Sequence, residues 1–98
     1  MAEDRILTLH PEGKKGVNIT RDKYEQVKAV ILDALTDTPG MTLDQLFDRS
    51  EEVLTGHFDG KIGWYVMSVK LDLEARGVIE RVPKASPQRL RLAATVDK

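Results

Sequence analysis

Three segments of helical periodicity, separated by breaks of a few residues, lie between Thr20 and Gly77 and constrain the fold more than any other feature. In the first segment, apolar side chains recur every three or four residues from Tyr24 to Leu35, and Thr20 precedes them as a candidate N-cap. The helix must end before Pro39, because proline cannot extend the hydrogen-bond ladder. We expect the order helix, short link, helix, short link, helix.

The second segment carries the most specific local signal, a capping box. Thr42 is the N-cap and Gln45 follows three residues later, while Met41 and Leu46 are spaced as a hydrophobic staple. Gly56 is expected to close this helix. Its outer side is acidic, and a solvated face is the simplest interpretation, with a metal site or a catalytic carboxylate pair as remote alternatives. The acidic residues are Asp44, Asp48, Glu51 and Glu52.

The third segment spans residues 62–76, and Asp59 is its candidate N-cap. Gly77 is expected to adopt the left-handed conformation that ends many helices, with Leu73 and Val78 in the apolar contact of a Schellman motif.

Short strands are expected at both ends of the chain. Residues 78–82 and 88–92 predict a hairpin around a proline-rich loop. Residues 5–9 and 16–19 also look extended, and they flank a turn-rich stretch. Either an N-terminal hairpin or an irregular arm fits this part of the chain.

A helix-turn-helix followed by a two-stranded hairpin resembles the winged-helix superfamily. The end of segment 66–81, Leu-Glu-Ala-Arg-Gly-Val-Ile-Glu-Arg, is similar to the junction of helix three and wing in many bacterial winged-helix regulators. The arm is similar to that of a small uncharacterised family of bacterial proteins. The resemblance implies an α+β winged helix, in which the third helix enters the DNA major groove and the wing touches phosphates. The single domain, residues 1–98, would comprise an arm (1–19), a three-helix core (20–77), a wing (78–92) and a frayed tail (93–98).

The third helix does not have the side chains that read bases. Its inner face is apolar, but the opposite side carries a second apolar stripe, with Tyr65 and Ser68 between the two. Asp72 and Glu74 are expected to point outward and to repel phosphates. The second stripe is either core covered by the arm or an exposed patch for a partner or a second copy. The inner face is Ile62, Val66, Val69 and Leu73, the second stripe is Trp64, Met67 and Leu71, and the covering residues would be Ile6, Leu7, Leu9, Val17 and Ile19.

The wing is the best nucleic-acid signal, although a solvated basic face is the competing interpretation. Its cations could neutralise phosphates without reading sequence. The predicted function is therefore a non-enzymatic, nucleic-acid-associated regulator, and the alternative is a protein-interaction or self-association module that uses Trp64, Tyr65, Met67 and Leu71. The candidate phosphate contacts are Arg81, Lys84, Arg89, Arg91 and Lys61.

Composition excludes several other classes. The chain has no cysteine, so disulfides, thiol catalysis and cysteine-ligated zinc are absent. His10 and His57 lie too far apart for a zinc-binding pair, and Gly13–Gly16 does not match a phosphate loop. We predict no enzyme activity, cofactor, metal, small-molecule substrate or membrane span, and a cytoplasmic location. The net charge of −1 hides an uneven distribution, because residues 33–60 carry seven acidic side chains against one basic.

Overall fold

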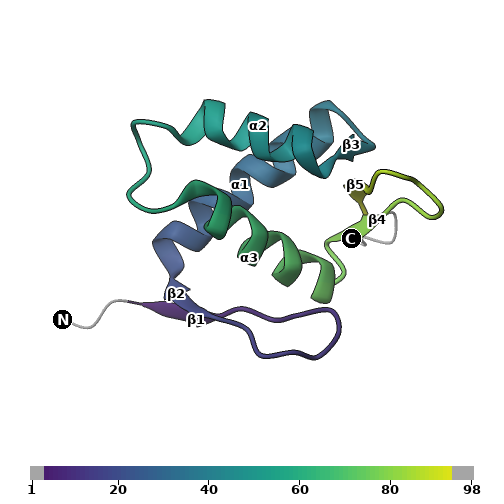
Figure 1. The fold of residues 1–98 in the computed structure, drawn as a ribbon. Coiled ribbons are helices and arrows are strands. Elements are labelled where there is room, and N and C mark those ends of the chain that lie inside the picture. The colour runs from purple at the N-terminus through teal and green to yellow at the C-terminus, as the bar shows by residue number, and fades with distance from the viewer. Residues whose placement is uncertain (1–3, 94–98) are drawn as a thin grey trace.

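The computed structural model describes residues 4–93, which form an α+β arrangement of three helices and two small antiparallel sheets (Figure 1). The first sheet pairs β1 with β2, and the second has the strand order β3-β5-β4. The predicted tail lies outside the described residues except for Ala93, which is buried. In chain order the elements are β1 (Arg5–Leu7), β2 (Asn18–Thr20), α1 (Arg21–Asp37), β3 (Met41–Thr42), α2 (Leu43–Leu54), α3 (Ile62–Ala75), β4 (Ile79–Arg81) and β5 (Arg89–Leu92).

Side-chain caps fix the starts of α1 and α2, as the sequence predicts. The Thr20 hydroxyl accepts a hydrogen bond from the Lys23 amide at 3.4 Å. At α2, the Gln45 amide donates to Thr42 Oγ1 at 3.1 Å and the Thr42 amide donates to Gln45 Oε1 at 2.9 Å, so the capping box is confirmed. The strand β3 is not predicted, because two residues are too few to show an alternating pattern.

The two ends of α3 differ in how well the sequence predicts them. At its C-terminus, Gly77 has φ +76°, its amide donates to the Glu74 carbonyl at 3.1 Å, and the Val78 amide donates to the Leu73 carbonyl at 2.9 Å, which is the predicted Schellman motif. The prediction of Asp59 as N-cap is wrong. Lys61 occupies that position without a side-chain hydrogen bond.

Gly60 explains why the chain enters α3 differently from the prediction. Its φ is +146°, and a Cβ there would lie 2.7 Å from Tyr65 Cε2. The ring of Tyr65 therefore packs directly on the backbone before the helix, and this turn places Asp59 upstream of the capping position.

The core lies between the three helices and the β3-β5-β4 sheet. Val27 and Ile31 of α1, Leu46 of α2, Leu73 of α3 and Leu90 of β5 are all fully buried. The Cα radius of gyration is 13.2 Å, close to the ~13 Å expected for a compact domain of about 100 residues. None of the helices among residues 4–93 is long and apolar enough to cross a membrane.

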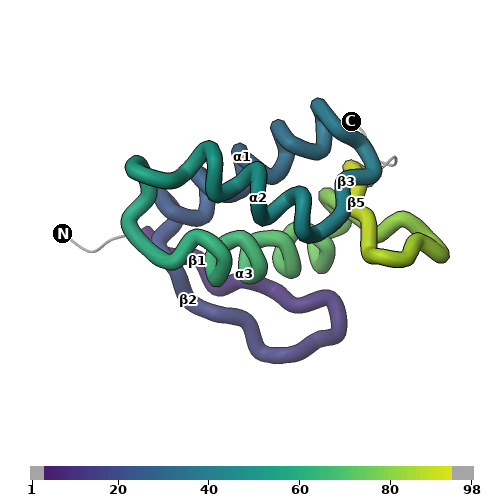
Figure 2. The backbone as a smooth tube through the Cα atoms, turned by 45° about the horizontal axis from the view of Figure 1, so that its top comes forward, coloured from purple at the N-terminus to yellow at the C-terminus, as the bar shows by residue number. Residues whose placement is uncertain are grey.

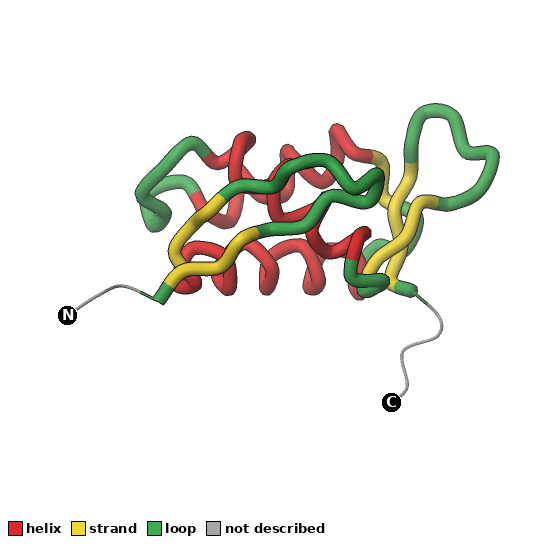
Figure 3. The backbone as a smooth tube through the Cα atoms, turned by 90° about the horizontal axis from the view of Figure 1, so that it is seen from below, coloured by secondary structure: helices red, strands yellow, loops and turns green. Residues whose placement is uncertain are grey.

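The N-terminal arm is a hairpin that runs beside α3 (Figures 1 and 2). The Thr8 amide donates to the Val17 carbonyl at 2.8 Å, and the Val17 amide donates to Thr8 Oγ1 at 2.9 Å. Gly16 permits this close approach, since a Cβ there would lie 1.8 Å from the Thr8 carbonyl oxygen. The loop of the arm and the β4–β5 hairpin extend at the same end of the molecule (Figure 3).

Candidate functional site

The outer side of α3 is an apolar stripe of three side chains, which we call the α3 outer face: Trp64, Met67 and Leu71. Trp64 is 47% exposed, and Met67 and Leu71 are half-buried. At 100° per residue this stripe lies opposite Val66 and Leu73, which are fully buried. The sequence therefore predicts the two apolar sides of α3. In the structure, the side that carries Trp64 lies at the surface.

The arm does not bury Trp64 of the α3 outer face. Ile19 is 2% exposed, and Ile6 and Val17 pack partly against the hydrophobic core between the helices. Leu7 is 58% exposed, however, and Leu9 is 44% exposed. Side chains alternate along an extended strand, so an arm that turns Ile6 inward turns Leu7 outward. Of the two alternatives, a covered core is therefore wrong for Trp64, whereas Met67 and Leu71 are half-buried.

Tyr65 anchors the N-terminal end of the α3 outer face. Its ring makes edge-to-face contacts with Phe58 and Trp64, with centroids 5.0 Å and 4.9 Å away. Lys23 of α1 places its Nζ over the Tyr65 ring, 5.4 Å from the ring centroid. These contacts hold the indole of Trp64 in place while leaving about half of it in solvent.

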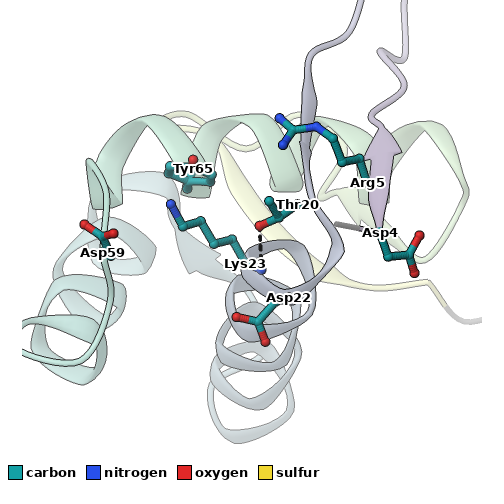
Figure 4. A pocket seen from close by; sticks show the side chains of 7 residues that line it. All are labelled: Asp4, Arg5, Thr20, Asp22, Lys23, Asp59 and Tyr65. Carbon is teal, nitrogen blue, oxygen red and sulfur yellow. Dashed lines mark hydrogen bonds between the residues drawn. The ribbon is translucent and has the colours of Figure 1, made fainter. Parts of the chain in front are cut away.

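A cavity of about 490 Å³ lies between the start of α1 and Tyr65. Figure 4 shows Lys23 reaching toward the Tyr65 ring, with Arg5 at the start of β1 and Asp4 just before it. Because three carboxylates and two cations line the cavity, its charge favours neither an anion nor a cation. The lining residues are Asp4, Arg5, Thr20, Asp22, Lys23, Asp59 and Tyr65.

Asp72 does not point outward, so its expected repulsion of phosphates is absent. The residue is 0% exposed, and its carboxylate accepts hydrogen bonds from the Leu9 amide and from Arg76 Nε, both at 2.9 Å, and from the Tyr24 hydroxyl. Burial, and then the hydrogen bond to Asp72, raise the pKa of Tyr24. The hydrogen bond to Asp72 also raises the pKa of Arg76. Asp72 thus ties α1 and the arm to α3.

Glu74 is also turned inward, toward a second buried ion-pair network. Its carboxylate lies 2.6 Å from Lys70 Nζ and 2.9 Å from Arg81 Nε, and its side chain is only 7% exposed. Lys70 is 1% exposed, although lysine is almost never buried unless it is paired. Sequence reasoning missed Lys70, and its i, i+4 spacing from Glu74 on the helix was the available signal.

The five candidate phosphate contacts do not form one surface. Lys61 lies at the N-terminal end of α3, away from the other four, which lie on the β4–β5 hairpin. Arg81 pairs with Glu74, and Arg91 Nε lies 2.6 Å from Glu80 Oε2. Arg89 donates to the Gly40 carbonyl at 2.8 Å, which fastens the hairpin to the turn before β3. Lys84 is exposed in the hairpin loop with φ +63°.

The histidines and acidic residues do not assemble a metal centre in the described part of the chain. No group of three or more His, Cys, Asp or Glu side chains there is placed to hold a metal ion. His10 accepts a hydrogen bond from the Glu12 amide at 3.1 Å within the arm loop. The four acidic residues of α2 are all exposed, as expected.

Comparison with known proteins gives one match. No curated protein and no solved structure matches the chain. The model of a family of unknown function, DUF6958, matches residues 5–90, which include the arm, the three helices and most of the C-terminal hairpin. The chain therefore belongs to the DUF6958 family.

Proposed function

We propose that the protein is a winged-helix domain that works as a protein-interaction module through the α3 outer face. The order of elements supports the winged-helix assignment: β3 joins α1 to α2, and the hairpin after α3 pairs with it in the order β3-β5-β4. In this assignment the β4–β5 hairpin is the wing.

The half-exposed indole of Trp64 is the observation that carries the proposal. Tryptophan and methionine are enriched at the centres of protein interfaces, where they bury much apolar area. The rest of the α3 outer face is also apolar, and the arm loop and the β4–β5 hairpin, which carry exposed charged residues, extend at the C-terminal end of α3 (Figures 1 and 3). An apolar centre with a charged border is the usual anatomy of an interface.

Site-specific photo-crosslinking tests this proposal. We expect a crosslinker at position 67, irradiated in cells that express the full chain, to give an adduct of one definite mass. Leu71→Lys should reduce its yield about tenfold or more, because it places a charge in an apolar contact. A matched Ala29→Lys change, at an exposed position of α1, should leave the yield unchanged. Absence of a discrete adduct would overturn the proposal.

Nucleic-acid association through the wing is the second candidate function. It is favoured by one observation: the arm loop and the wing extend at the same end of α3 and both carry exposed lysines, Lys15 and Lys84 (Figure 3). The ion pairs of Arg81 and Arg91 reduce the positive charge that the wing offers to phosphates.

A titration with random-sequence duplex DNA at low and moderate salt tests the second candidate. Phosphate contact predicts binding that weakens steeply as salt rises. The double variant Arg89→Ala with Arg91→Ala should make the plot of log K against log salt less steep, by about 1 to 2 units of slope. Lack of binding at low salt would remove this candidate.

A further inference from the structure

We propose that the partner of the α3 outer face is a second copy of this chain, packed so that the two α3 helices run antiparallel about a two-fold axis. This inference rests on the proposed function and names its partner.

The two ends of α3 differ in the charge of the elements around them. At the C-terminal end lie the arm loop and the β4–β5 hairpin, whose exposed cations include Lys15, Lys84 and Arg89. At the N-terminal end lie the last turn of α2 and the link to α3, where exposed Glu51, Glu52 and Asp59 outnumber the exposed Lys61. We call these the basic end and the acidic end.

The direction of packing follows from this asymmetry. A two-fold axis perpendicular to α3 places the basic end of each copy beside the acidic end of the other, so the same favourable pairing occurs twice. Parallel packing would instead bring like ends together. The charge distribution therefore selects the antiparallel arrangement.

The spacing of the apolar side chains fits the same axis. Trp64 and Leu71 are seven residues apart, about 10 Å along a helix. When the axis passes near Met67, each indole meets Leu71 of the other copy, and the two Met67 side chains meet at the centre. A self-complementary contact of this kind closes as a dimer and leaves no open surface for further copies.

The buried networks are compatible with this contact. Asp72 accepts its hydrogen bonds, and Glu74 makes its ion pairs, within each copy, on sides of α3 that face the arm and the hairpin. Packing on the α3 outer face therefore requires no buried ion pair to break. The cations assigned to the contact, Lys15 and Lys84, form no ion pair with another described residue.

Sedimentation equilibrium of paired charge-reversal variants tests the proposal. One variant reverses the acidic end (Glu51→Lys with Glu52→Lys), and the other reverses the basic end (Lys15→Glu with Lys84→Glu). We expect each variant alone to dimerise at least about tenfold more weakly than the native chain, because like charges face each other twice. An equimolar mixture should recover heterodimers, since both pairings are then favourable. Asp33→Lys, at an exposed position of α1, is the matched control and should dimerise normally.

The outcomes separate this inference from the proposed function. Circular dichroism first establishes that each variant is folded. A native chain that stays monomeric to millimolar concentration would overturn the dimer, and a crosslinked adduct of a different mass would then show that the face serves another partner. A native dimer whose variants do not recover on mixing would overturn the antiparallel arrangement.

Discussion

Asp72→Ala should lower the free energy of unfolding by about 2 to 5 kcal/mol, because it leaves more than one hydrogen-bond donor without an acceptor, at about 1 to 3 kcal/mol for each buried one. The carboxylate is fully buried, and its loss leaves the Tyr24 hydroxyl, the Leu9 amide and Arg76 without their shared acceptor. Buried donors without partners are costly, because they gave up water on folding. Urea denaturation followed by circular dichroism measures the change.

Two further variants distinguish loss of the acceptor from loss of bulk. Asp72→Asn retains the size of the side chain but removes its charge, so we expect a smaller loss, about 1 to 3 kcal/mol. Asp48→Ala, on the exposed face of α2, should change stability by less than about 0.5 kcal/mol. Hydrogen exchange adds a local readout, since the Leu9 amide should exchange faster in Asp72→Asn. A loss no greater than that of Asp48→Ala would contradict the role assigned to Asp72.

The second large effect concerns the ammonium of Lys70, which is buried against Glu74. Glu74→Gln removes the counter-charge and should lower the free energy of unfolding by about 3 to 5 kcal/mol. Lys70→Met should cost much less, because methionine fills the same space and Glu74 retains Arg81. Replacing a buried pair by apolar groups is often neutral.

The double variant makes this prediction specific. Lys70→Met combined with Glu74→Gln should recover most of the stability that Glu74→Gln loses, because no buried ammonium remains. The same urea denaturation measures all three variants. If the double variant is as unstable as Glu74→Gln alone, the loss does not arise from an unpaired Lys70, and the account of this network is wrong.

Local signals in the sequence predict most of the secondary structure. The capping box at Thr42 and the Schellman ending at Gly77 each depend on a few neighbouring residues, so short sequence patterns are enough to place them. The entry into α3 is different, since it depends on the contact between Gly60 and the Tyr65 ring. The strand β3 depends on its pairing with β5, which lies far away in the sequence.

The charged residues of α3 show where sequence patterns stop being informative. Periodicity identifies the α3 outer face, but it assigns Asp72 and Glu74 to solvent because acidic residues are usually exposed. Their burial depends on partners from other elements: Tyr24 and Leu9 for Asp72, and Arg81 for Glu74. The tertiary fold decides which cation pairs with which carboxylate. The sequence therefore does not predict that Arg81 of the hairpin pairs with Glu74, which reduces the positive charge of the hairpin.

Fluorescence quenching of Trp64 by acrylamide, measured across a dilution series, tests the central claim that a second copy of the chain covers the α3 outer face. Trp64 is the only tryptophan in the chain, so the signal reports this face alone. We predict strong quenching in dilute solution, where the indole is half-exposed, and protection as concentration rises and a second copy covers it. A quenching constant that stays the same from dilute to millimolar protein would contradict a dimer that packs on this face.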